Sequence, residues 1–150
     1  MGTGTINAVG IWFYCITTQK YLYLMRNDSK HFGSWGLAGG KVEVGETLLD
    51  TITRECVEEI GFMPEYTQLT PIDKFTSFDK RFHYHTFICK VIDEFLPKLN
   101  WEHVGYAWID KNVLPKPLHP GLWNTTNFEE IKTKIDIVIY REESLAETKH

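Results

Sequence analysis

The stretch GKVEVGETLLDTITRECVEEIGF, residues 40–62, decides the fold of this chain. It predicts a helix over about residues 47–60. Thr47 and Asp50 have the spacing of a capping box at the start of this helix. Gly61 stands where a residue in the left-handed conformation would end it. The segment therefore predicts one short, well-capped helix.

The acidic residues of this helix lie at the edge of its apolar side. At about 100° per residue, Glu55, Glu58 and Glu59 fall on the arc next to the apolar one. The apolar arc consists of Leu49, Ile52, Cys56 and Ile60. Like charges three or four residues apart cost an isolated helix roughly 0.2–0.5 kcal/mol per pair. A bound divalent cation would make this unfavourable contribution to stability favourable, because magnesium prefers oxygen ligands.

A glycine-rich segment precedes the helix. It contains Gly33, Gly36, Gly39, Gly40 and Gly45. Glycine allows the backbone to turn sharply and to approach a ligand closely. A backbone carbonyl or amide in this segment could therefore contact a metal ion or a phosphate.

These features resemble the signature of the Nudix hydrolases, G-x5-E-x7-R-E-U-x-E-E-x-G-U, in which U is apolar. The matching residues are Gly40, Glu46, Arg54, Glu55, Cys56, Glu58, Glu59, Gly61 and Phe62. Cys56 replaces the usual Ile, Leu or Val, and Ala38 stands where many members have Pro. With each fixed position near 6–7% in average usage, a chance match is on the order of one in a million.

The resemblance implies the α/β class, as an α/β/α sandwich with a mixed β-sheet between helices. It also implies hydrolysis of a nucleoside diphosphate linked to another group, by attack of water on phosphorus. The implied cofactor is Mg²⁺, for which Mn²⁺ can substitute. The implied partner is a small-molecule nucleotide substrate.

The resemblance assigns metal-binding roles to five positions. Glu58 and Glu59 match the principal metal ligands of the family. Glu55 matches a position that is a ligand or a general base. A backbone carbonyl of Gly39 or Gly40 matches a further ligand.

Three other residues complete the expected catalytic site. Arg54 and Glu46 are expected to form an ion pair that supports the loop, and Arg54 would also orient Glu55. Glu102 precedes Trp108 in a segment where many Nudix proteins carry an acidic residue. It would complete the metal shell, act as the base or bind the substrate, and the sequence does not choose between Glu55 and Glu102 as the base.

Substrate contacts are expected from aromatic and histidine side chains near this site. Phe78 and Trp101 could stack on a nucleobase, because aromatic faces accept bases. His83 and His85 alternate on one face of an expected strand, but no third ligand at zinc-binding spacing accompanies them. His83 is therefore expected to pack or to contact the substrate.

The substrate itself stays open among ADP-ribose, diadenosine polyphosphates, FAD, modified nucleoside triphosphates and capped RNA. The proline typical of ADP-ribose pyrophosphatases is absent near Phe78, and so is the tyrosine that marks many diadenosine-polyphosphate hydrolases. A noncatalytic nucleotide sensor or adaptor is the alternative from another class. Action on RNA 5′ ends is a third possibility, suggested by the basic residues between Lys74 and His83.

Composition predicts a single domain over residues 1–150, with a frayed tail at about 141–150. The chain has 150 residues, of which 43% are hydrophobic and 24% charged, as in ordinary globular proteins. The net charge of −4 argues against broad binding to nucleic acid. Three scattered cysteines and the lack of a long apolar span predict a cytoplasmic protein, or a host-cytoplasmic one if the source is a phage or virus. A homodimer is possible by analogy with similar proteins.

The remaining pattern alternates strands and helices. Two β-rich runs around the polar TTQK segment predict a hairpin, and a capping box at Thr126 and Glu129 predicts a second helix. The expected strands are 6–16, 21–25, 82–92 and 104–109, with a loop at 94–100.

Overall fold

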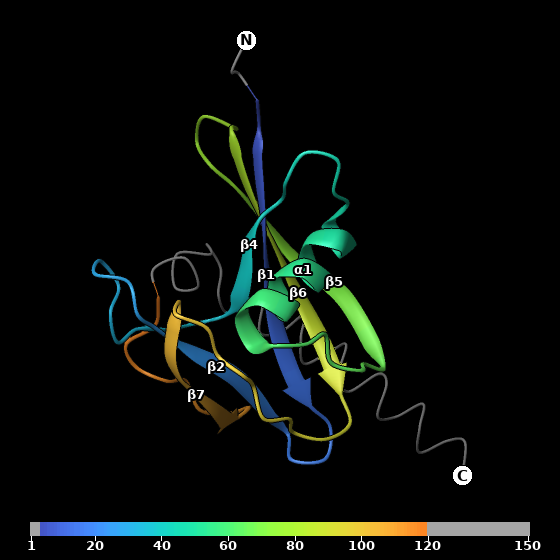
Figure 1. Cartoon of the computed structure of the whole chain (residues 1–150), viewed down its shortest axis with the longest axis vertical. Helices are drawn as coiled ribbons and strands as arrows, with labels where there is room; N and C mark the ends of the chain where they lie inside the picture. Colours follow the sequence, from blue (N-terminus) through green and yellow to red (C-terminus); the bar gives the residue numbers. More distant parts are fainter. Residues whose placement is uncertain (1–3, 120–150) are drawn as a thin grey trace.

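The computed structural model describes residues 4–119, which form one mixed β-sheet with a helix against it (Figure 1). The strands are β1 (Ile6–Cys15), β2 (Lys20–Arg26), β3 (Trp35–Gly36), β4 (Ala38–Lys41), β5 (Gln68–Thr76), β6 (Phe82–Val91) and β7 (His103–Asp110). They are ordered β3-β2-β1-β6-β5, with β4 paired to β1 and β7 paired to β2. β1 and β6 are parallel and the other pairs antiparallel, so the predicted α/β class with a mixed sheet is confirmed. The helix expected from Thr126 and the tail at 141–150 lie outside the described residues.

The helix α1 (Leu48–Ile60) has the predicted ends. The Asp50 amide donates to Thr47 Oγ1 over 3.1 Å, and the Thr47 amide donates to Asp50 Oδ2 over 3.0 Å. Gly61 follows the helix with φ 91°, in the left-handed region. Both hydrogen bonds of the capping box satisfy amides that a helix start leaves without a partner.

α1 covers one face of the sheet (Figure 1), with its apolar arc in the core except for Leu49, which is 50% exposed. Ile52, Cys56 and Ile60 are fully buried there, among the alternate residues Val9 and Ile11 of β1. Burial of each such aliphatic side chain contributes about 1.5–3 kcal/mol. The opposite face of the sheet carries a second buried cluster, rich in aromatic residues: Trp12, Tyr14, Tyr21, Tyr23, Leu37, Ile72 and Ile88.

The predicted β1–β2 hairpin is present, but it is paired only next to its turn. Tyr14 and Cys15 pair with β2, whereas residues 8–11 pair with β4 instead. The sequence analysis predicted no strand at residues 38–41, because consecutive glycines have low strand propensity. It also missed β5, which contains Pro71 at a register irregularity of its pairing with β6. An edge strand tolerates proline there.

Candidate active site

The paired glycines bring β4 against both β1 and α1. Gly39 has φ +150°, and a Cβ at that position would overlap the Val9 carbonyl group of β1. A Cβ at Gly40 would overlap Glu55 Oε1 and lie 2.6 Å from Glu55 Cδ. The carboxylate of Glu55 therefore packs directly on the backbone of β4, in space that a larger residue would fill.

Arg54 connects the loop before α1, the end of β4 and the helix itself. Its Nε and Nη2 donate to the two oxygens of Glu46 over 2.7 and 3.0 Å, which forms the expected ion pair. Its Nη1 donates to Glu55 Oε1 over 2.8 Å, and its Nη2 also donates to the Lys41 carbonyl over 2.9 Å. The hydrogen bonds from Arg54 lower the pKa of Glu46 to about 2. The guanidinium thus fixes one oxygen of Glu55 and the loop at the same time.

Glu59 lies deeper in the protein than the other acidic residues of the helix. Its side chain is 1% exposed, and the Gly39 amide donates to its Oε2 over 2.7 Å. Burial raises the pKa of Glu59 far above its usual range, and the nearby charges of Glu102 and Glu55 raise it further. Burial also raises the pKa of Glu55, against the lowering effect of Arg54. Because this local excess of negative charge is costly, a cation would relieve it.

Glu58 and Glu102 border these buried carboxyls from two sides. The Glu58 side chain is half exposed and lies 3.4 Å from Arg54 Nη1. Glu102 stands in the turn before β7, where its side chain lies within hydrogen-bonding range of Glu59. Three of the predicted catalytic carboxylates, those of Glu55, Glu59 and Glu102, are therefore brought together.

The donor set fits a divalent cation with hard oxygen ligands. Carboxylates dominate it, and the Glu55 carboxylate packs directly on the backbone of Gly40. Within residues 4–119, no three acidic, histidine or cysteine side chains already stand in a coordinating group. Arg54 holds Glu55 in place and only approaches Glu58, so we expect the half-exposed Glu58 carboxylate to turn toward a cation when one binds.

A small pocket that the sequence analysis missed adjoins the glycine pair. It has a volume of about 150 Å³ and is lined by Val9, Arg26, Gly36, Leu37, Gly39, Gly40, Tyr84 and His119. Arg26 lines this pocket and forms an ion pair with Asp28, with Nε 3.0 Å from Oδ1, and burial lowers the pKa of His119 to about 4. Arg26 ends β2 but lies just outside the predicted strand 21–25, and no sequence signal marked it as a site residue.

The three residues predicted to contact substrate lie in two places. Phe78 is in the β5–β6 turn and fully exposed, at the end of the sheet where β1 begins (Figure 1). His83 follows near the start of β6, where its Nδ1 is 3.0 Å from Thr76 Oγ1. Trp101 is mostly exposed and stands directly before Glu102. Proximity to the carboxylates thus favours Trp101 over the other two.

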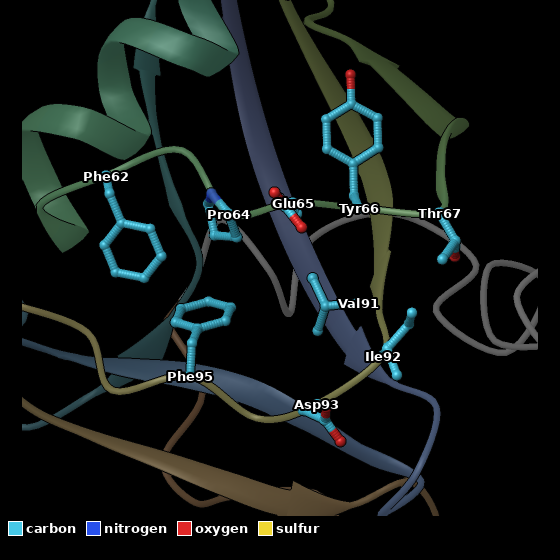
Figure 2. Close-up of a pocket in the computed structure, with 9 residues that line it drawn as sticks. All are labelled: Phe62, Pro64, Glu65, Tyr66, Thr67, Val91, Ile92, Asp93 and Phe95. Carbon is cyan, nitrogen blue, oxygen red and sulfur yellow. The ribbon is translucent and has the colours of Figure 1, made fainter.

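A larger pocket of about 360 Å³ lies beyond the end of α1 (Figure 2). Phe62 and Phe95 meet there edge to face, with ring centroids 5.4 Å apart. Glu65 and Asp93 also line the pocket, and none of its lining residues is basic. Two carboxylates without a cationic residue disfavour a polyphosphate, so this pocket is not the expected substrate site.

The structure combines a mixed β-sheet with a helix whose acidic residues lie against a glycine-rich strand, and this combination defines a class of domain. The NUDIX domain model matches residues 5–127 of the chain, and the chain belongs to this family. Members of this family generally use divalent metal ions.

Two curated proteins resemble the chain in sequence. An ADP-ribose pyrophosphatase from Methanocaldococcus jannaschii is 33% identical over 100 residues, which cover 65% of this chain and 59% of that protein. The nucleoside triphosphatase NudI from Escherichia coli O17:K52:H18 is 35% identical over 88 residues, which cover 51% and 62%. The chain therefore spans about 60% of the length of these relatives.

The fold also matches solved structures. The NUDIX domain of Shewanella oneidensis NrtR, solved in complex with ADP ribose, superposes with a TM-score of 0.67 and 17% identity. The match covers 88% of this chain and 89% of that one. At this level of identity the likeness establishes the fold.

Proposed function

We propose that this chain is a Mg²⁺-dependent hydrolase that cleaves a pyrophosphate bond in nucleoside diphosphate derivatives. The observation that carries the proposal is the cluster of Glu55, Glu59 and Glu102 against the glycine pair. Such a cluster is costly without a cation, and a pocket lined by Arg26, which pairs with Asp28, adjoins the same glycine pair. A metal-assisted reaction of a polyanion needs both features.

Different carboxylates would bind the cation and accept the proton. Glu58 and Glu59, with a carbonyl of Gly39 or Gly40, would hold the cation. A bound Mg²⁺ or Mn²⁺ supplies charge neutralisation of the phosphates and polarises the phosphorus that is attacked. Glu55 or Glu102 would accept the proton of the attacking water. Arg54 would keep Glu55 in place through the 2.8 Å hydrogen bond to its Oε1.

Arg26 would bind the substrate, because its guanidinium is suited to an anionic phosphate oxygen. Water attack on one phosphorus breaks the P–O–P bridge and leaves two phosphate products, one on each side of the broken bond. ADP-ribose would give AMP and ribose 5-phosphate, whereas a nucleoside triphosphate would give a monophosphate and pyrophosphate. ADP-ribose is our first candidate, since a relative at 33% identity is an ADP-ribose pyrophosphatase.

Product analysis after incubation with Mg²⁺ tests the proposal. The panel contains ADP-ribose, diadenosine polyphosphates, FAD, nucleoside triphosphates and capped RNA, and Glu58→Gln is the matched control. Cleavage of one class by the parent chain, with loss in the Glu58→Gln variant, supports the proposal. Tight binding without cleavage at any metal concentration would instead establish a noncatalytic sensor.

The expected partner is the nucleotide substrate. Among residues 4–119 no helix is long and apolar enough to cross a membrane. One NUDIX domain over residues 1–150, a homodimer and a cytoplasmic location stay predictions of the sequence.

A further inference from the structure

His103 is a buried side chain next to the acidic cluster, and none of the roles assigned above uses it. Its residue is 3% exposed, and within residues 4–119 neither ring nitrogen has a hydrogen-bond partner. Its Nδ1 lies 3.8 Å from Glu59 Oε1. A buried polar side chain without a hydrogen bond costs about 1–3 kcal/mol, so this placement calls for an explanation.

A β-bulge puts His103 on the helix-facing side of the sheet. Leu22 pairs with Trp108, and Leu24, two residues further on, pairs with Tyr106. Leu22, Leu24 and Trp108 pack in the core beneath α1. Regular alternation would next pair Arg26 with Val104, but the register shifts and Arg26 pairs with His103. Bulges of this kind redirect a side chain and are frequent beside active sites.

The carboxylate of Glu59 is held firmly at one oxygen. The Gly39 amide donates to Oε2 over 2.7 Å, whereas Oε1 faces His103 at 3.8 Å. A carboxylate held at one oxygen can still rotate about its terminal bond. A donor on the second oxygen would fix its plane, and hydrogen bonds in apo sites commonly shorten when the ligand binds.

We propose that His103 is a positioning residue whose ring N–H donates to Glu59 Oε1 and fixes this carboxylate for binding of a divalent cation. The inference rests on the proposed function, because it concerns the same cation. Partners that orient a metal ligand typically change metal affinity or activity 10–100-fold when they are removed.

The test is a titration of the full chain with Mn²⁺, followed by electron paramagnetic resonance of the free ion. His103→Leu removes the donor at similar volume, and we expect its Kd for Mn²⁺ to rise about tenfold. His85→Leu is the matched control, because His85 is a strand histidine that contacts Asn7 instead of Glu59. A Kd of His103→Leu within twofold of the parent would overturn the proposal.

Three further variants keep the test decisive. If His103→Leu does not fold, His103→Gln and His103→Asn replace it. The amide nitrogen of Asn takes the position of Nδ1, the ring nitrogen that faces Glu59, whereas that of Gln takes the position of Nε2. His103→Asn should therefore retain more Mn²⁺ affinity than His103→Gln, and equal affinities would contradict the positioning role. Glu59→Gln is titrated in parallel. Unchanged affinity in Glu59→Gln would refute the metal site itself, whereas loss in Glu59→Gln with none in His103→Leu would refute this inference alone.

Discussion

Replacing Gly40 by Ala tests how closely the backbone of β4 holds the catalytic carboxylates. The new methyl carbon would lie 2.6 Å from Glu55 Cδ and 2.9 Å from Oε2. Carbon atoms in favourable contact are about 3.5–4.0 Å apart, so the Glu55 carboxyl group must move by roughly 1 Å. The carboxyl is the end of a flexible side chain, and we therefore expect it to turn away while the sheet stays intact.

The expected loss falls on activity much more than on stability. A displacement of about 1 Å at a catalytic group can lower the rate about 100-fold. Overpacking costs about 1–3 kcal/mol, and the smaller backbone entropy of unfolded alanine offsets about 0.4–1 kcal/mol of this. We therefore expect kcat/KM for ADP-ribose with Mg²⁺ to fall about 100-fold, and the free energy of unfolding to fall by no more than about 2.6 kcal/mol.

Gly105→Ala provides the control for the loss of a strand glycine. Its Cβ would meet Met25 Cβ at 3.9 Å, which is ordinary van der Waals contact. Steady-state kinetics and urea unfolding are measured for both variants. The reasoning is refuted if Gly40→Ala keeps more than half of the parent activity, or if Gly105→Ala loses as much.

Three further changes test the charges of the site. In chelator, Glu59→Gln should unfold with a free energy within about 1 kcal/mol of the parent, because the raised pKa keeps the buried carboxyl protonated and Gln still accepts from Gly39. The variant should also lose the stabilisation that Mg²⁺ gives the parent, which is about 2.7 kcal/mol when the Mg²⁺ concentration is 100 times Kd. A thermal-shift assay measures this loss. Arg54→Lys cannot bind Glu46 at both oxygens, so we expect about tenfold lower kcat/KM in the same kinetic assay. Burial lowers the pKa of His103 to about 4, below the unfolded value of 6.5. Between these values the unfolded chain binds more protons, so stability falls as the pH falls. Urea unfolding at pH 7 and pH 4 should show the parent losing up to about 3 kcal/mol more than His103→Leu.

Each of these expectations has a clear contrary result. Mg²⁺-dependent stabilisation that survives in Glu59→Gln would remove this carboxylate from the metal site. Full activity in Arg54→Lys would show that the bidentate contact with Glu46 is dispensable. An equal loss of stability in the parent and His103→Leu on acidification would mean that His103 is not the group that titrates.

The helix ends followed from the sequence because Thr47 and Asp50 interact across one turn. The ion pair of Arg54 with Glu46, which stands directly before the N-cap Thr47, was expected from the family resemblance. His103 could not be assigned in this way. Its position depends on a register shift between two strands nearly eighty residues apart in sequence. The same holds for β4, whose glycines form a strand because β1 supplies their pairing partners.

The division of β1 between two partners has a consequence for changing this protein in the laboratory. Its first half pairs with β4 and its end pairs with β2, so the glycine pair is anchored in the sheet. The segments 27–34 and 42–46 enter and leave this region as connections that are mostly exposed, although Ser34 is buried and Glu46 binds Arg54. A library that varies the exposed positions of these two segments and keeps Glu46 should change which nucleotides are accepted while the carboxylates stay in place. Selection for a new substrate can therefore begin with substitutions in these two segments, while the residues of the sheet are left unchanged.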